Sequence, residues 1–289
     1  MRQTVGYLPS RLYSRLRSAF SSILSTYVCL HSRIIRLHLV FYSPNLSRPP
    51  GKMGHIQQLW IRTNYALTKA VKEGHLLAHP QDKHWLFLPG TDSSILETAF
   101  NRNSSTYRMW TDPDRNHDIG SYSHKLIRHM LRFNGFRQPK NPPTFYLESG
   151  QEINPDAFTL TPISAAFEVK NGTSDVWTDP RTIAENLRSG DYKQILAHFQ
   201  MCKEHQLYPG FIGVKFDPAF YDFANDNHGL AFQLGFQIFP PWLQPLKNAI
   251  ASDLGFRNIV VASEEPPYPP EFEPFFRWLD SIKQLRRTP

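Results

Sequence analysis

Apolar side chains recur every three to four residues in several stretches of the chain, the spacing of helices with one buried face. This pattern predicts helices at residues 53–75, 119–133 and 191–205, and an amphipathic helix after 266-PPYPP-270. A further helix is expected at 241–253, and Asp179-Pro180 has the form of a helix start. The predicted buried faces are Ile56, Leu59, Trp60, Leu67, Ala70 and Val71; Leu126, Ile127, Met130 and Leu131; Tyr192, Ile195, Leu196, Phe199 and Cys202; and Phe272, Phe275, Phe276, Leu279 and Ile282.

Short runs of β-branched and aromatic residues lie between these helices and predict strands. The expected strands are 144–149, 152–160, 164–170, 210–216, 230–239 and 258–262. Residues 84–90 are a short apolar run that ends in a turn, and the polar segment 100–117 is predicted to be a loop. From 119 to 216 the order is helix, three strands, helix, strand, which indicates an α/β fold with a mixed β-sheet flanked by helices.

The net charge of +7 is unevenly distributed along the 289 residues. Eleven Lys and Arg precede the first acidic residue, Glu73, which leaves 21 basic and 25 acidic residues from there onward, a net of −4. Residues 1–52 are rich in Arg and Ser, so we expect either a non-functional extension, with Met53 as the true start, or an organelle-targeting presequence. The high pI therefore does not indicate that the body of the chain binds nucleic acid.

Composition excludes several classes of protein. Cys29 and Cys202 are too few for a disulfide framework or a Cys-type zinc site, and they suit a reducing compartment such as the cytoplasm. No apolar stretch reaches the roughly 20 residues that span a bilayer. The chain has neither a phosphate-binding Gly-x-x-x-x-Gly-Lys-Ser/Thr run nor a Gly-x-Ser-x-Gly elbow.

The segment 154-NPDAFTLTPISAAFEVKNG-172 joins two of the predicted strands. If they form an antiparallel hairpin that turns near Pro162, opposite residues have numbers that sum to about 324, so Asp156 faces Glu168. Lys170 lies on the same face as Glu168 because strand side chains alternate. Three charged groups are therefore expected to converge on one side of the hairpin.

Two facing carboxylates repel each other unless a cation lies between them. Hard oxygen ligands suit Mg²⁺ or Mn²⁺, whose remaining positions are filled by water and substrate phosphates. The ammonium of Lys170 is expected to hold a water molecule or a phosphate oxygen. These groups are the ones that attack on a phosphodiester requires. The alternative is an exposed hairpin whose Asp156, Glu168 and Lys170 are solvated.

Pro155-Asp156 and Glu168-Val169-Lys170 resemble the motif of the PD-(D/E)XK nucleases, the restriction-endonuclease-like superfamily. The order of elements over residues 118–216 also resembles its core. The resemblance implies that Asp156 and Glu168 bind Mg²⁺, that the Val169 carbonyl adds a ligand, and that Lys170 orients the attacking water.

Two further features of the superfamily are only partly matched. Some members carry an acidic residue on the first core helix, but here that helix has no Glu, and Glu148 or Glu152 would have to substitute. Some have Gln-x-x-x-Tyr on the helix after the lysine, where this chain has Gln194 and His198, and a solvated helix face explains this pair equally well. His124 lies on the first helix, and we expect it, like His117 and His129, at the surface or in contact with phosphate.

We therefore expect a metal-dependent nuclease that acts on DNA, with a homodimer as a possible assembly. Two alternatives stay open: a non-catalytic nucleic-acid or protein-binding module on the same fold, and a small-molecule enzyme with a site around residues 217–228. The expected divisions are 1–52 as leader, 53–117 as a helical and loop segment, 118–262 as nuclease core, and 263–289 as linker and final helix. The expected contacts to the DNA backbone are Lys125, Arg128, Arg132, Lys193 and Gln194.

Overall fold

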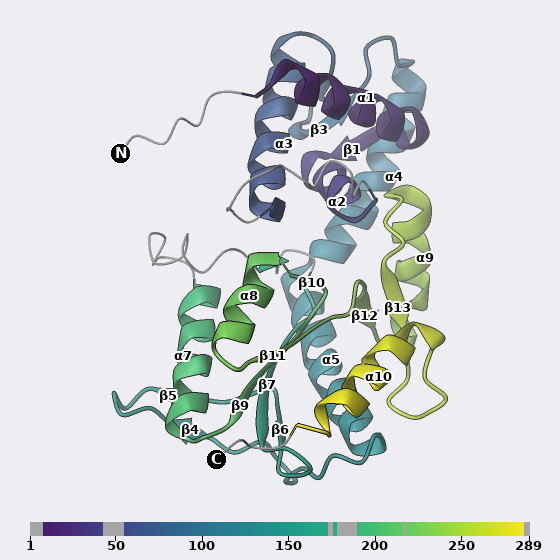
Figure 1. The fold of residues 1–289 in the computed structure, drawn as a ribbon. Coiled ribbons are helices and arrows are strands. Elements are labelled where there is room, and N and C mark those ends of the chain that lie inside the picture. Colours follow the sequence, from purple (N-terminus) through teal and green to yellow (C-terminus); the bar gives the residue numbers. More distant parts are fainter. Residues whose placement is uncertain (1–7, 43–54, 173–175, 178–189, 217, 286–289) are drawn as a thin grey trace. The chain divides into compact units, whose positions relative to one another are not determined.

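The computed structural model describes residues 8–42, 55–172, 176–177, 190–216 and 218–285 (Figure 1). The chain is a mixed α/β protein with several sheets, and it divides into two compact units. Unit 1 consists of residues 1–112 and 245–257, and unit 2 of residues 113–244 and 258–289. This division differs from the one that composition suggests, since a late segment of the chain belongs to unit 1 and the first helix of unit 2 begins at Pro113.

Unit 1 has helices around a small antiparallel sheet of order β1-β3-β2. Residues 10–42 are part of this unit, with apolar side chains such as Leu16, Phe20 and Ile34 fully buried. Its elements are α1 (Ser10–Tyr27), β1 (Cys29–His31), α2 (Ser32–Tyr42), α3 (His55–Lys72), β2 (Leu77–His79), β3 (Asp82–Phe87), α4 (Ser93–Thr111) and, from its second residue on, α9 (Gln244–Asp253).

The loop predicted at 100–117 is wrong, because α4 covers most of it and α5 (Pro113–Phe133) begins at its end. Asp92 caps α4 by accepting from the backbone amides of Ser94 and Ile95. The prediction is wrong because several polar side chains in this segment are buried and hydrogen-bonded inside unit 1. Asn103 donates to the carbonyls of Tyr27 and Cys29 at 3.2 and 2.8 Å, on either side of a turn in which Val28 has a φ of 64°.

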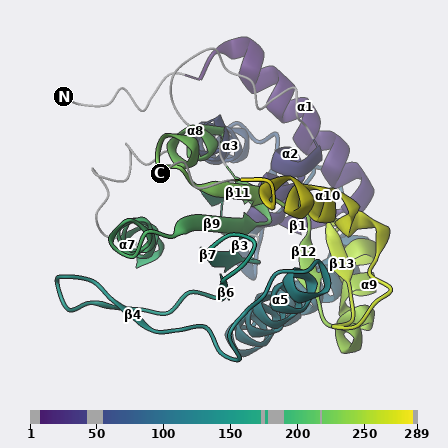
Figure 2. The same ribbon diagram turned by 60° about the horizontal axis from the view of Figure 1, so that its bottom comes forward.

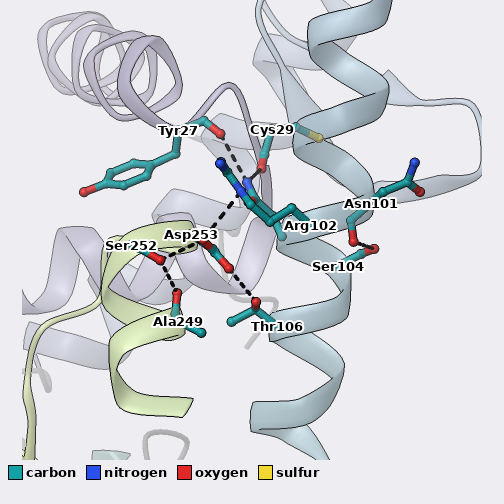
Figure 3. A network of polar contacts seen from close by, with 10 residues as sticks. Tyr27, Cys29, Asn101, Arg102, Ser104, Thr106, Ala249, Ser252 and Asp253 are labelled. Atoms are coloured by element: carbon teal, nitrogen blue, oxygen red, sulfur yellow. Dashed lines mark hydrogen bonds and ion pairs between the residues drawn. The ribbon is translucent and has the colours of Figure 1, made fainter. Parts of the chain in front are cut away.

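Asp253, the last residue of α9, anchors the late segment to α4 (Figure 3). Its carboxylate accepts from Thr106 Oγ1 at 2.7 Å and from Ser252 Oγ at 2.7 Å, and it lies 3.5 Å from Arg102 Nε. Gly255 follows with a φ of +69°, and a Cβ there would lie 2.2 Å from the Tyr27 ring. This end of the segment therefore needs both the conformational freedom and the small size of glycine.

Unit 2 is built on a four-stranded mixed sheet of order β11-β9-β7-β6 (Figure 2). Strands β7 (Ala165–Lys170), β9 (Tyr208–Gly213) and β11 (Leu230–Gln233) run parallel, and β6 (Ala157–Thr159) is the antiparallel edge. The remaining elements are β4 (Phe145–Tyr146), β5 (Glu152–Ile153), β8 (Val176–Trp177), α7 (Gly190–Glu204), β10 (Lys215–Phe216), α8 (Pro218–Asp226), β12 (Gln237–Phe239), η2 (Pro241–Leu243), β13 (Ile259–Val261), η3 (Pro270–Phe272) and α10 (Glu273–Ile282).

Alternation along β7 directs its side chains to two different cores. Phe167 and Val169 pack with Leu126, Ile127 and the rest of the buried face of α5, together with α10. Ala166 packs with Ala197 and Met201 of α7 on the other face. Glu168 and Lys170 share the face of Ala166, so the alternation places them on the side of α7.

Several finer predictions for unit 2 need correction. Residues 152–160 are not one strand, since 154–156 interrupt β5 and β6, and the strand predicted at 144–149 shrinks to β4. Residues 234–236 divide the run at 230–239 between two sheets. Leu196 is 41% exposed, because the buried face of α7 includes Ala197 and His198 instead. The predicted helix start at 179–180 lies outside the described residues.

Candidate metal-binding active site

The hairpin register brings Asp156 and Glu168 together. Ala157 pairs with Phe167 and Thr159 with Ala165, so opposite residue numbers sum to 324, and the predicted register is confirmed. Asp156 directly precedes Ala157, and the same register continued by one residue places it opposite Glu168. Its Oδ2 accepts a hydrogen bond of 2.7 Å from the amide of Val169, which fixes one side of the carboxylate.

Lys170 lies between a carboxylate and an amide. Its Nζ is 2.9 Å from Glu168 Oε1 and donates to Gln194 Oε1 at 3.0 Å. Glu168 is only 2% exposed, and the Lys170 ammonium offsets part of the cost of burying its charge. A buried carboxylate is costly to ionise, and such groups are typical of sites that bind a ligand.

The surroundings of both carboxyl groups disfavour their ionised forms. Burial raises the pKa of Asp156, and the hydrogen bond from the Val169 amide and the charge of Lys170 only partly oppose this. Burial also raises the pKa of Glu168, and repulsion from Asp156 raises it further. A cation between the two groups would relieve the cost of ionising both.

His124, on α5, belongs to the site, although its sequence position indicates only a surface or phosphate contact. Its Nδ1 lies 3.0 Å from Asp156 Oδ1, and it forms a hydrogen bond with the backbone of Val169. Burial lowers the pKa of His124, which favours the neutral imidazole, a form that binds metal ions. Sequence alone missed this role because it depends on how α5 packs against the end of the hairpin.

A cavity of about 340 Å³ adjoins Glu168. It is lined also by Gln151, Glu152, Ile153, Asn154, Gln194 and His198. His198 is fully buried, with Nε2 3.1 Å from the Ala166 carbonyl, and burial lowers its pKa to about 4, so the ring is neutral at pH 7. The cavity leaves room for a substrate group beside Glu168.

The two acids considered as substitutes differ in position. Glu152 lines the cavity and accepts from the Asn154 amide at 2.8 Å. Glu148 is exposed, and its backbone amide donates to Glu204 Oε2, away from the lining of the cavity. Only Glu152 is therefore placed to contribute charge beside Glu168.

The predicted DNA contacts fall into different environments. Arg128 lies close enough to lower the pKa of Asp156, Arg132 is exposed on α5, and Lys125 pairs with Glu264 at 2.8 Å. Gln194 is exposed and is held by Lys170, while the side chain of Lys193 lies outside the described part of the chain. Arg128 is thus the predicted basic contact that the structure brings to the carboxylates.

The donor set fits a hard divalent ion, but incompletely. Asp156, Glu168 and the Val169 carbonyl offer oxygen atoms, the ligands that Mg²⁺ and Mn²⁺ prefer. Within the residues that the structure describes, no group of three His, Cys, Asp or Glu side chains is arranged to hold one ion. Water and substrate oxygens would have to supply the rest of the shell, as Mg²⁺ sites commonly do.

Comparisons with protein-family models, with curated proteins and with solved structures find no match to this chain. None of the helices in the described residues is long and apolar enough to cross a membrane. The geometry of the site is therefore what indicates the function.

Proposed function

We propose that the chain is a metal-dependent nuclease with a restriction-endonuclease-like core in unit 2. The observation that carries the proposal is the convergence of Asp156, Glu168 and Lys170 at the end of one hairpin, where the buried Glu168 also lines a cavity. Each residue type matches a need of phosphodiester hydrolysis: charge neutralisation, a held ion and a positioned water.

Each residue of the site would have a distinct role in this reaction. Asp156, Glu168 and the Val169 carbonyl would hold Mg²⁺ or Mn²⁺, with His124 steadying Asp156 Oδ1. When bound, such an ion would lower the pKa of a coordinated water and neutralise charge at the phosphate. Lys170 Nζ, held by Glu168 and Gln194, donates to the attacking water or to a phosphate oxygen. Arg128 adds positive charge for the substrate backbone.

DNA is the proposed substrate, and a reducing compartment such as the cytoplasm is the proposed setting, because Cys29 and Cys202 are both free and buried. Of the alternatives, a non-catalytic binding module on the same core is favoured by one observation, the lack of a third His, Cys, Asp or Glu ligand among the described residues. The small-molecule site around 217–228 has less support, because Phe220 and Ala224 pack into a core.

The test uses the full chain with supercoiled DNA, linear DNA and RNA, each in Mg²⁺, Mn²⁺ and EDTA. We expect cutting that needs the metal and is lost in Lys170→Ala. The matched control is Lys203→Ala, which removes an exposed lysine from α7 and should cut normally. Binding without cutting in either metal, by folded protein, would favour the binding module instead.

A further inference from the structure

The two units carry opposite net charges. By sequence, unit 1 contains 16 Lys and Arg against 6 Asp and Glu, a net of +10. Unit 2 contains 16 against 19, a net of −3. The unit with the candidate active site is therefore not the unit whose net charge would attract a polyanion, and the positive charge that gives the chain its high pI belongs to unit 1.

Contacts between α1 and α3 bring part of this charge together. Lys69 Nζ lies 4.3 Å above the centre of the Tyr13 ring, and the Tyr13 hydroxyl donates to Glu73 Oε2 at 2.6 Å. Arg17 contacts His75 at 2.9 Å. The first half of α1 thus lies beside the end of α3. We define the α1–α3 basic patch as Arg11, Arg15, Arg17, Lys69 and Lys72.

Glu73, the acidic residue that contacts this patch in the described part of unit 1, is already engaged. Glu73 accepts from Tyr13 and lies 3.7 Å from Lys69 and 3.5 Å from His75. Lys69 and Arg17 therefore lie beside a carboxylate that is already engaged, and Arg11, Arg15 and Lys72 add exposed positive charge on the same two helices.

The exposed face of α1 continues the patch as a stripe of Arg and Ser. Arg11, Ser14, Arg15, Ser18 and Ser22 are exposed and recur at helical spacing. Arginine and serine side chains are common donors to phosphate oxygens, and consecutive arginines at i and i+4 lie about 6 Å apart along the helix axis. The stripe carries no acidic side chain that would repel a polyanion.

The other face of α1 decides between two anionic partners. A helix that binds a lipid surface must insert its apolar face between the headgroups. Here that face is occupied, since Tyr13, Leu16, Phe20 and Leu24 are buried inside unit 1. The most exposed side chains of α1 are charged or carry hydroxyl groups, which favours a backbone of phosphates over a membrane.

We propose that the α1–α3 basic patch is a nucleic-acid-binding surface that contacts phosphates without reading sequence. It is a site separate from the proposed nuclease centre, and it requires neither a metal nor catalysis. A chain with this surface recruits its substrate through unit 1 and leaves unit 2 to provide the chemistry.

The test measures the binding of a fluorescent DNA duplex to the full chain in EDTA, by anisotropy over a range of salt concentrations. The variant Arg11→Gln/Arg15→Gln removes two exposed charges, and Lys140→Gln/Lys203→Gln removes two exposed charges from unit 2 as the matched control. Each lost phosphate contact should reduce the slope of log K against log salt by about 0.9. We expect a slope smaller by about 2 and roughly tenfold weaker binding for the first variant, and little change for the control.

Circular dichroism establishes that both variants are folded. Equal weakening by the two double variants would overturn the proposal, because it would mean that only net charge matters. Binding of anionic phosphatidylserine vesicles, lost in Arg11→Gln/Arg15→Gln while duplex binding persists, would overturn it in favour of a lipid surface. If the duplex binds through the patch but no metal supports cutting, the patch stands and the proposed nuclease activity fails.

Discussion

Asp253 in unit 1 and Glu168 in unit 2 are both shielded carboxylates, with side chains 13% and 3% exposed. Asp253 is held by Thr106, Ser252 and Arg102. Glu168 is contacted by Lys170, but burial and repulsion from Asp156 both raise its pKa. The partners of Asp253 stabilise both its charge and the fold. Glu168 stays buried despite repulsion, and a buried carboxylate with a raised pKa is typical of a functional site, so the comparison points to unit 2.

The largest expected effect is the loss of DNA cutting when Glu168, but not Asp253, is replaced. Glu168→Gln keeps the shape of the side chain but removes its charge, so we expect cutting to fall by at least about a thousandfold. Its free energy of unfolding in EDTA should change little, because the lost repulsion from Asp156 offsets the lost ion pair with Lys170. Plasmid cleavage and urea denaturation measure the two quantities. A clear loss of stability would mean that Glu168 is structural.

Asp253→Ala should have the opposite effect: it should lower stability and leave cutting unchanged. Removing the acceptor leaves the Thr106 hydroxyl without its partner and weakens the attachment of α9, which should cost about 1–3 kcal/mol. Urea denaturation gives the change, and Asp280→Ala, on the exposed side of α10, is the matched control. Cutting per folded molecule is expected to be normal, and a specific loss of cutting would contradict the structural role.

The same contrast applies to two histidines. His38 contacts the Leu254 carbonyl at 2.8 Å inside unit 1, whereas His124 lies 3.0 Å from Asp156. We expect His124→Ala to weaken Mn²⁺ binding at least tenfold with little loss of stability, since groups that orient metal ligands have effects of this size. His38→Ala should destabilise the fold and leave Mn²⁺ affinity unchanged. Calorimetric titration with Mn²⁺ and urea denaturation distinguish the two.

The smallest effect is a pH dependence of stability in EDTA. The pKa values of Asp156 and Glu168 are raised by folding, so between the ordinary carboxyl range of about 4 and neutrality the folded state binds more protons than the unfolded state. Stability from this pair is therefore present at low pH and falls as pH rises through the raised values, by at most about 1.4 kcal/mol per pH unit and proton.

Mg²⁺ sharpens this test. It should raise the melting temperature at neutral pH and lose its effect as the carboxyl groups take up protons. Glu168→Gln should flatten the pH dependence in EDTA and abolish the response to Mg²⁺. A wild-type melting temperature that ignores Mg²⁺ at every pH would count against an ion at this pair.

The sequence predicts the positions of side chains best where one short-range rule determines them. The register of the hairpin follows from a turn near Pro162 and the alternation of strand side chains, so Asp156, Glu168 and Lys170 could be brought together in advance. His124 and the fold of residues 100–111 were missed for a common reason. The partners of these side chains come from elements distant in the chain: the end of the hairpin for His124 and residues 27–29 for Asn103. In addition, a polar residue type does not by itself indicate whether the side chain is buried.

The return of residues 245–257 to unit 1 has a consequence for dissecting the protein. Leu246, Ile250 and Phe256 are buried within unit 1, where Phe256 packs at 5.2 Å from Trp110 and 5.1 Å from Phe41. A fragment that begins at Pro113 would therefore carry these apolar side chains without their core, a surface prone to aggregation. A soluble fragment of unit 2 would need a short polar linker in place of residues 245–257, and a gene truncated only at its 5′ end should yield insoluble protein.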